Sequence, residues 1–376
     1  MQSYLEFARA HQSEIIALLR ELVLAESPSF DAAAVNRFVE LVADKLNGVG
    51  KVKTFPGGRF GKHLRCEFKL PGRGKQGQIL ALGHSDTVWE IGQIPFAVSK
   101  ERIAGPGVLD MKSGIAFFIF AMRALVELDR PVKHGVVLQL NSDEEVGSES
   151  SRPLTEEAAK KSATVLVLEP GTGLEGKLKT ARKGVGDYVV TVKGRAAHSG
   201  LDFEAGASAV LELARQIERI ATFTNIKRGI TVNPGVISGG TRTNVIAAEA
   251  RVEVDMRVAR LKDAAVLDKK FRSLKPIDKR CSIQVEGGLN RPPMERSPEI
   301  RALFKTAQSL AREIGVKLEE SSVGGGSDGN FTAALDIPTL DGLGGVGEGA
   351  HAVNESILID RIADRTALLA GLVATL

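Results

Sequence analysis

An apolar segment that runs into an acidic turn is the feature that most constrains the fold of this chain. Residues 136–138 are Val-Val-Leu, and the adjacent acids Glu144 and Glu145 follow shortly after them. A continuous apolar run predicts a strand that is buried on both faces, and in open α/β sheets the carboxyl ends of such strands hold the ligand-binding groups. Two adjacent carboxylates repel each other and lose hydration there unless cations hold them. The rest of the chain must therefore supply positive charge near this pair.

Strands and helices alternate on both sides of this segment. Apolar residues three and four positions apart predict the helices, and Asp31 is placed to cap the second of them. Helices are predicted at 5–24, 32–46, 115–128 and 154–161, strands at 63–70, 79–82, 136–140 and 163–168, and a loop at 71–77. Strands separated by helices predict a covered, largely parallel sheet.

A different pattern begins near residue 183. Its elements follow the order strand, helix, strand, strand, helix, strand, which is that of a ferredoxin-like unit, at 187–192, 205–221, 230–237, 245–258, 262–274 and 282–286. After Arg291-Pro-Pro the α/β pattern returns, at 298–314, 331–335, 337–340 and 356–372. We therefore predict the α/β fold class, with one discontinuous domain over 1–181 and 292–376 and an inserted ferredoxin-like α+β domain over 182–291.

Composition narrows the class of protein. The 376 residues are 43% hydrophobic and 26% charged, which is typical of a globular chain with room for two domains. The net charge is only +4 and the Lys and Arg residues are dispersed, so we expect neither a nucleic-acid partner nor a membrane partner. Cys66 and Cys281 form no Cys-x-x-Cys pair, which argues against a cysteine zinc site. The start of the chain has no apolar signal core, so we expect a cytoplasmic protein, or a secreted one if the numbering is that of a mature form.

Two histidines and four acids lie at predicted strand ends or in loops of the larger domain. They are His84, Asp86, Asp110, Glu145, Glu169 and His351. Imidazole and carboxylate ligands together suit zinc, and two imidazoles with three carboxylates fill two adjacent sites that share one bridging carboxylate. Two divalent ions outweigh three ligand carboxylates, and the remaining positive charge tolerates Glu144 nearby.

Each of these residues, taken alone, has a simpler interpretation as a core histidine, a turn residue or a loop acid. The spacing of His84 and Asp86 adds information, because residues two apart on an extended chain face the same way. Asp86 is therefore placed to orient a metal-bound His84. It is the whole set, rather than any member, that predicts a metal centre.

The candidate residues lie within short motifs, which are Gly83-His-Ser-Asp-Thr-Val88, Gly105-Pro-Gly-Val-Leu-Asp-Met-Lys-Ser-Gly114, Asp143-Glu-Glu-Val-Gly147, Leu168-Glu-Pro170 and Gly349-Ala-His351. The order of these motifs along the chain resembles that of the M20 metallopeptidases, and within them it is most similar to the glutamate carboxypeptidase group. The resemblance covers nearly the whole chain and includes an inserted lid or dimerisation domain.

This resemblance implies a role for each residue of the site. Asp110 would bridge two Zn²⁺ ions, His84 and Glu169 would complete one site, and Glu145 and His351 would complete the other. Glu144 would be the general base for the attacking water, and Asp86 would orient His84. A carboxylate in that position can take the proton of the water and pass it to the leaving amine.

The inserted domain and its flanks carry further candidates by the same resemblance. His198, in Lys193-Gly-Arg-Ala-Ala-His198, would stabilise the oxyanion, in its own subunit or in the partner subunit of a homodimer. The residues that would hold carboxylates of the substrate are Lys177, Asn244, Arg257 and Arg291. Two arginines and a lysine in one pocket suit an acidic residue with a free C-terminal carboxylate, because guanidinium binds carboxylate bidentately.

The sequence thus predicts a di-zinc carboxypeptidase that cleaves the amide bond to a C-terminal acidic residue, most simply glutamate, in peptides, folate-like compounds or N-acyl substrates. One alternative is an N-acyl amino acid deacylase or dipeptidase of the same fold with non-acidic specificity. A second, from another class, is a metal-binding scaffold without catalysis, against which Glu144 argues. A third is a nucleotide-binding enzyme that uses the Gly324-Gly-Gly-Ser-Asp-Gly-Asn330 loop, but this loop lacks the Gly-Lys-Ser/Thr ending of a phosphate loop.

Overall fold

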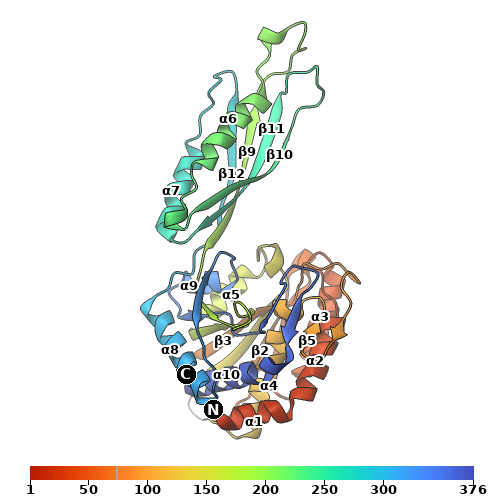
Figure 1. Ribbon diagram of the computed structural model, residues 1–376, viewed down its shortest axis with the longest axis vertical. Coiled ribbons are helices and arrows are strands. Elements are labelled where there is room, and N and C mark those ends of the chain that lie inside the picture. Colours follow the sequence, from red (N-terminus) through yellow and green to blue (C-terminus); the bar gives the residue numbers. More distant parts are fainter. Residues whose placement is uncertain (73–74) are drawn as a thin grey trace. The chain divides into compact units, whose positions relative to one another are not determined.

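A six-stranded mixed sheet forms the centre of the larger of the two units into which the chain divides (Figure 1). The computed structural model describes residues 1–72 and 75–376, so part of the predicted 71–77 loop lies outside the described residues. The larger unit comprises Met1–Ala181, Arg296–Ser322 and Ser327–Leu376. The smaller unit comprises Arg182–Glu295 and Val323–Gly326.

The central sheet has the order β1-β2-β6-β3-β7-β14. Its strands are β1 (Gly50–Pro56), β2 (Lys62–Phe68), β6 (Gly135–Asn141), β3 (Gln78–His84), β7 (Ser162–Val167) and β14 (Thr339–Leu340). The strands β6, β3, β7 and β14 run parallel to one another, whereas β2 is antiparallel to both β1 and β6. The parallel centre brings the carboxyl ends of β6, β3 and β7 to one edge.

Helices bury both faces of this sheet, which explains the continuous apolar runs of its inner strands. Along β3, Ile79 and Ala81 pack into the large core, whereas Leu80 and Leu82 pack into a smaller core on the opposite face. The large core involves α1 (Gln2–Ala10), α2 (Gln12–Leu24), α3 (Ala32–Lys45), α4 (Ser113–Glu127), α8 (Pro298–Glu313) and α10 (Ile362–Thr375). The opposite face is covered by α5 (Arg152–Ala159) and α9 (Gly329–Ala333) (Figure 1).

The sequence sets several of these boundaries by local chemistry. Asp31 caps α3, because its carboxylate accepts a hydrogen bond of 2.9 Å from the amide of Ala34, as predicted. Helix α4 is apolar on nearly all sides and is buried between other elements from Ser113 to Leu125. The predicted helix at 5–24 is instead two helices, because the backbone at His11 leaves helical geometry and the His11 Nδ1 lies 2.9 Å from the carbonyl oxygen of Phe7.

The smaller unit has the order of elements that the sequence predicted. Its antiparallel sheet is β10-β11-β9-β12, formed by β10 (Thr231–Gly239), β11 (Glu249–Val258), β9 (Gly184–Lys193) and β12 (Ser282–Arg291). One face packs on α6 (Ala209–Ala221) and α7 (Leu261–Arg272), and buried residues alternate with exposed ones along β11. The fold class is therefore confirmed as α/β with an inserted ferredoxin-like unit.

Main-chain hydrogen bonds explain the bounds of the smaller unit. The amide of Arg182 donates to the carbonyl of Met294 at 3.0 Å, and the amide of Lys183 donates to the carbonyl of Val323 at 3.0 Å. These bonds explain why the smaller unit extends to Glu295 and takes in Val323–Gly326.

Two further small sheets belong to the structure, formed by β13 (Glu320–Val323) with β8 (Leu178–Arg182), and by β15 (Gly347–Glu348), β16 (Ser356–Leu358), β5 (Arg102–Ala104) and β4 (Ala97–Val98).

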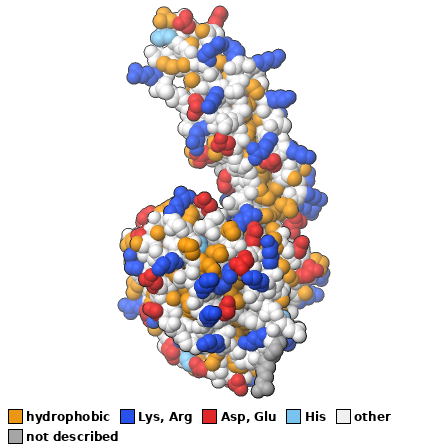
Figure 2. All heavy atoms as spheres, turned by 180° about the vertical axis from the view of Figure 1, so that it is seen from behind, with side chains coloured by type: hydrophobic (Ala, Val, Ile, Leu, Met, Phe, Trp, Pro, Cys, Tyr) orange, Lys and Arg blue, Asp and Glu red, His pale blue; other side chains and the backbone are white. Residues whose placement is uncertain are grey.

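The surface carries charges of both signs. Figure 2 shows Lys and Arg side chains interspersed with acidic and apolar ones on the visible face. Among the described residues, no helix combines the length and hydropathy needed to cross a bilayer.

Candidate active site

The predicted metal-binding residues of the larger unit lie at the carboxyl edge of its parallel strands. His84 is the last residue of β3, Glu144 and Glu145 lie in the 3₁₀ turn Glu144–Val146 after β6, and Glu169 follows β7. Asp110 comes from the turn before α4, and His351 from the loop after β15. Because β6, β3 and β7 are adjacent parallel strands, their carboxyl ends bring His84, the acidic turn and Glu169 together.

Asp110 lies between the two histidines. Its Oδ1 is 3.2 Å from Nε2 of His84, and its Oδ2 is 3.4 Å from Nε2 of His351. Each histidine also contacts a glutamate, since Nε2 of His84 is 3.4 Å from Oε1 of Glu169 and Nε2 of His351 is 3.2 Å from Oε2 of Glu145. The five side chains thus form two imidazole-carboxylate groups that share Asp110.

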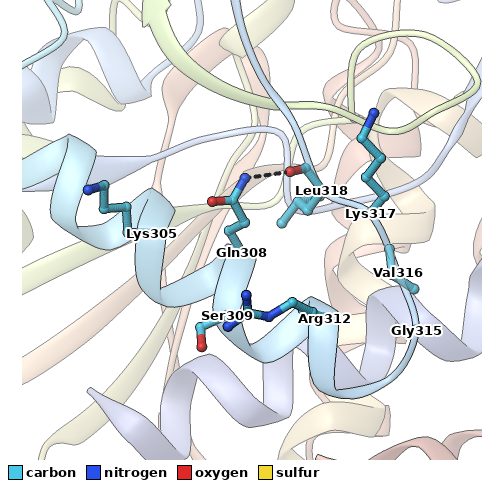
Figure 3. Close-up of a pocket in the computed structure, with 8 residues that line it drawn as sticks. All are labelled: Lys305, Gln308, Ser309, Arg312, Gly315, Val316, Lys317 and Leu318. Atoms are coloured by element: carbon cyan, nitrogen blue, oxygen red, sulfur yellow. Dashed lines mark hydrogen bonds between the residues drawn. The ribbon is translucent and has the colours of Figure 1, made fainter.

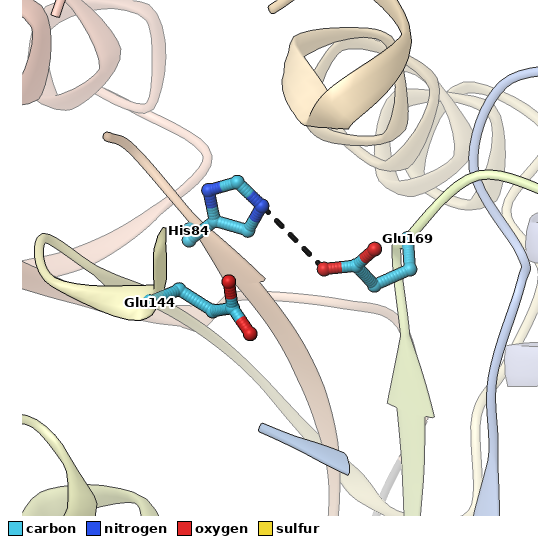
Figure 4. A group of neighbouring side chains, drawn as sticks. All are labelled: His84, Glu144 and Glu169. Atoms are coloured by element: carbon cyan, nitrogen blue, oxygen red, sulfur yellow. Dashed lines mark ion pairs between the residues drawn. The ribbon is translucent and has the colours of Figure 1, made fainter. Parts of the chain in front are cut away.

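Glu144 faces the same space from the acidic turn. Figure 4 shows its carboxylate directed toward His84 and Glu169, with the ion pair between the latter two drawn. One potential ligand atom from each of these three residues lies within 4.8 Å of the others, and the same holds for His84, Asp110 and Glu145. Glu144 is therefore close enough to act on a molecule held between the groups.

The electrostatics show what this cluster needs. Burial opposes the ionisation of Asp110, but hydrogen bonds from His351 and His84 outweigh it and hold the pKa of Asp110 well below its usual range. Burial together with the charge of Asp110 raises the pKa of Glu145 to about 7. Bonds to Asp110 and Glu145 raise the pKa of His351 to about 11. Four carboxylates crowd two imidazoles here, so the cluster attracts cations.

The donor set fits metal ions. The Oε1 atom of Glu145 is buried and has no hydrogen-bond partner among the described residues, which is costly for a carboxylate oxygen unless a cation binds it. Imidazole nitrogen and carboxylate oxygen are ligands that suit zinc and related divalent ions. The shared position of Asp110 suits two neighbouring ions rather than one.

Asp86 is buried beside this cluster and contacts both His84 and the acidic turn. The Nδ1 of His84 is 2.9 Å from the main-chain oxygen of Asp86, and 3.5 Å from its Oδ1. The carboxylate itself accepts hydrogen bonds of 3.2 Å from the amides of Glu144 and Glu145, and one of 2.8 Å from Oγ of Ser29. Asp86 therefore contacts His84 through its main chain and fixes the acidic turn through its side chain.

A buried network that the sequence did not reveal supports the acidic turn from behind. The amide of Ser142 donates to Nδ1 of His63 at 3.1 Å, so this nitrogen carries no proton. Nε2 then donates to Oγ of Ser150 at 3.1 Å, and Ser150 donates to Oδ2 of Asp143 at 2.7 Å. Burial lowers the pKa of His63, which agrees with a neutral ring. No spacing signal marked His63, because it occupies one ordinary buried position of β2.

The predicted substrate-binding residues are divided between the units. Lys177 belongs to the larger unit, where its Nζ lies 3.3 Å from Oε2 of Glu319. Arg257 belongs to the smaller unit and pairs with Asp255 at 2.8 Å, and Arg291 is buried at the end of β12. Each cation therefore has its own environment, and the structure does not group the three within one unit.

His198 and Asn244 lie close together in the smaller unit. The main chain of His198 forms an isolated antiparallel β-bridge with that of Val245, and the amide of Ser199 donates to the carbonyl of Asn244 at 3.0 Å. Both side chains are exposed. A pocket of about 610 Å³ in this unit is lined in part by Ser199 and Thr243. The lining of this pocket also includes apolar side chains.

A different pocket, of about 600 Å³, lies beside the C-terminal half of α8 (Figure 3). Its lining contains Lys305, Arg312 and Lys317 but neither a histidine nor a carboxylate. Gln308 closes one side by donating to the carbonyl of Leu318 at 2.9 Å. Size alone does not identify the reactive site, because this pocket lacks the groups that could bind a metal or transfer a proton.

Comparisons with known proteins agree with this geometry. Residues 80–375 match the peptidase family M20/M25/M40. Carboxypeptidase G2 from Pseudomonas sp. (strain RS-16) is 28% identical over 354 residues, which cover 92% of this chain and 85% of that protein. The crystal structure of aminopeptidase PepT from Bacillus cereus ATCC 10987 has a TM-score of 0.80 at 22% identity, and covers 96% of this chain and 98% of its own.

A further structure of similar fold is described as metal-binding. The YXEP protein from Bacillus subtilis, described as a dinuclear metal-binding peptidase of the M20 family, has a TM-score of 0.70 at 15% identity, with 98% of each chain covered. The family match spans most of the chain, including every residue of the histidine and carboxylate cluster. The resemblance drawn from the motifs is thereby confirmed: this chain belongs to the M20/M25/M40 peptidase family and is a metallopeptidase.

Proposed function

We propose that this protein is a di-zinc carboxypeptidase that cleaves the amide bond to a C-terminal acidic residue, with glutamate as the preferred residue. The observation that carries the proposal is the position of Asp110 between His84 and His351, each of which has its own glutamate partner. Carboxypeptidase G2 supports the carboxypeptidase type, because its alignment covers 92% of this chain.

The mechanism follows from the chain's own residues. Two zinc ions held by His84, Asp110, Glu145, Glu169 and His351 would polarise the scissile carbonyl and lower the pKa of water. Glu144 then takes a proton from the attacking water as the new C–O bond forms. The same carboxyl group gives that proton to the leaving nitrogen as the C–N bond breaks. Asp86 keeps Glu144 in place, because its Oδ1 accepts the hydrogen bond from the Glu144 amide.

His198 is proposed to stabilise the negative charge that develops on the carbonyl oxygen. Its imidazole is exposed on the smaller unit and can donate a hydrogen bond outward. Loss of one such donor typically costs about 3 kcal/mol of transition-state stabilisation. Asn244, which lies beside it, is proposed to hold the substrate's carboxylate together with Lys177, Arg257 and Arg291.

Substrate choice is tested by a panel of N-acyl amino acids and dipeptides that vary first in the C-terminal residue. We expect Arg257→Ala to lower kcat/KM for the glutamate substrate by roughly 10- to 100-fold, because a charge-assisted hydrogen bond contributes about 1.5–3 kcal/mol. The same substitution should change kcat/KM for an alanine-terminated substrate little. Lys177→Ala is expected to act in the same direction.

Arg251→Ala is the matched control for this experiment. Arg251 also lies on β11 and pairs with an acid two residues away, Glu253, just as Arg257 pairs with Asp255. We expect the glutamate preference to survive this change. Equal losses on glutamate and alanine substrates in the Arg257 variant would contradict acidic specificity and favour the alternative, a dipeptidase or N-acyl amino acid deacylase with non-acidic specificity.

We further propose a homodimer formed through the smaller unit. Strand β10 is an edge of the four-stranded sheet and exposes Val236 and Ile237, and α6 exposes Val210 and Leu211. An unpaired edge with apolar side chains invites pairing with a second copy. Light scattering should give twice the chain mass for the wild type, and Ile237→Lys should shift it toward the monomer. A wild type that is monomeric at micromolar concentration would contradict the dimer.

A further inference from the structure

Glu355 is a buried carboxylate that lies outside the histidine and carboxylate cluster. Its residue is 1% exposed, and among the described residues the buried Lys112 interacts with it electrostatically but forms no ion pair with it. Four N–H groups take that place. Oε1 accepts from the amides of Leu109 at 2.8 Å and Asp110 at 3.0 Å, and Oε2 accepts from the amide of Gly107 at 3.0 Å and Nε1 of Trp89 at 2.6 Å.

Three of these donors belong to the turn that carries Asp110. Gly107 has a left-handed backbone with φ of +71°, and a Cβ at this position would meet the side chain of Thr87 at 2.5 Å. The turn therefore requires glycine at this position. Three of its main-chain amides point at the carboxylate of Glu355. Because the bond from the Asp110 amide ends on Oε1 of Glu355, that carboxylate fixes the backbone from which the shared side chain of Asp110 projects.

Glu355 also ends the loop that carries His351. The amide of Ala352 donates to the carbonyl of Gly349 at 2.8 Å, and the amide of Glu355 donates to the carbonyl of Ala352 at 2.9 Å. Gly349 has a φ of +84°, which lets the loop turn back on itself. Immediately afterwards Ser356 begins β16, which pairs with β5. Glu355 is thus the point at which the His351 loop is tied to the Asp110 turn.

The contact pattern requires a carboxylate rather than an amide. Each oxygen of Glu355 accepts two N–H groups, so both ends of the side chain must be acceptors. A glutamine of nearly the same shape would direct its NH₂ group at two N–H donors whichever way it is turned. The alternative is that the carboxylate contributes only to the stability of the fold. In that case its replacement should leave the affinity for metal unchanged.

We propose that Glu355 is a positioning residue of the metal centre, which sets the distance between Asp110 and His351 and thereby the affinity of the site for metal. This inference rests on the proposed function, because it assumes that Asp110 and His351 bind the ions. Glu355 touches neither substrate nor metal in this role. It acts through the Asp110 turn and the His351 loop, whose side chains meet at 3.4 Å.

The test compares Glu355→Gln with Glu348→Gln. Glu348 lies in the same segment, on β15, but is exposed and pairs with Arg102 at 2.9 Å. Zinc affinity and stoichiometry are measured by competition with a chromophoric chelator, and the thermal unfolding of each metal-free protein is recorded. We expect Glu355→Gln to weaken zinc binding by roughly 10- to 100-fold, as loss of a residue that supports a ligand typically does, and Glu348→Gln to stay within about twofold of the wild type.

Cobalt supplies a second readout. We expect the visible absorption of the Co²⁺-loaded Glu355 variant to differ from that of the wild type, because the ligand geometry changes, whereas the Glu348 variant should match the wild type. A Glu355→Gln protein that loses thermal stability without metal but keeps wild-type zinc affinity and the wild-type cobalt spectrum would overturn the proposal.

Trp89→Phe covers the case in which Glu355→Gln does not fold, since it removes one donor and leaves the three main-chain donors in place. We expect a several-fold loss of zinc affinity from it, and unchanged affinity would count against a positioning role. Failure of the proposed function would be distinguishable from failure of the Glu355 proposal. If the proposed function were wrong, the wild type itself would not bind zinc or would not hydrolyse the substrate panel.

Discussion

Replacement of Glu144 by glutamine is expected to abolish hydrolysis while both metal ions stay bound. The amide cannot accept the proton of the attacking water, and general acid-base catalysis of this kind contributes roughly 10²- to 10⁴-fold. The change keeps the size of the side chain and keeps the Glu144 amide that donates to Asp86. The measurement is kcat on an N-acyl glutamate substrate together with zinc content by atomic absorption.

Glu149→Gln is the control for this variant. Glu149 follows shortly after the acidic turn, but it is exposed and pairs with Arg59 at 3.0 Å on the surface, so its loss should leave kcat unchanged. An active Glu144→Gln enzyme would remove Glu144 from the mechanism. Loss of one zinc equivalent would instead make Glu144 a ligand, an outcome worth testing because its carboxylate lies within reach of His84 and Glu169.

The sequence predicted which side chains lie together better than it predicted the residues that support them. His84, Glu145 and Glu169 were found because they follow apolar strands, and the parallel order of β6, β3 and β7 brings such strand ends together whatever the loops do. Asp110 and His351 lie in loops, and the sequence marked them as candidates by residue type and the family motifs gave them their roles. Their meeting at 3.4 Å depends on tertiary contacts that have no local signature.

Glu355 and His63 show why the supporting residues stayed hidden. Each is a buried polar residue outside the predicted site, and its function is defined by groups distant in sequence, such as Trp89 for Glu355 and Ser142 for His63. Asp86 was predicted through its spacing from His84, but its carboxylate also holds the amides of the acidic turn. Spacing along one strand carries no information about hydrogen bonds across a sheet.

The fold departed from prediction where exposure or local turns decided the outcome. Strand β1 was not predicted, because it is an edge strand that alternates lysines with only partly buried residues. Helix α6 begins at Ala209 rather than at 205, because a 3₁₀ turn over Phe203–Ala205 comes first and Ser208 then caps the helix with a hydrogen bond of 3.3 Å from the amide of Leu211. Long apolar elements such as α4 were predicted to within two residues at each end.

The second large effect is expected from Asp110→Asn, which should remove both metal ions and all activity. The Asp110 carboxylate offers one oxygen to each histidine group, whereas an asparagine offers a single oxygen and turns its NH₂ toward the other group. We therefore expect the zinc content to fall from two equivalents to well below one at micromolar free zinc. Excess zinc should not restore kcat, although it should restore wild-type enzyme after removal of metal by EDTA.

Glu169→Gln is the control for Asp110→Asn, because it removes a ligand of one metal site rather than the ligand that the two sites share. Glu169 contacts His84 at 3.4 Å and belongs to one of the two groups, so this variant should keep about one zinc equivalent, held by the Glu145 and His351 side. Both metal-free variants should show the circular dichroism of the metal-free wild type, which excludes unfolding as the cause. If Asp110→Asn retained two equivalents, or if Glu169→Gln lost both, Asp110 would not be the carboxylate that the two ions share, and the assignment of ligands to two groups would have to be redrawn.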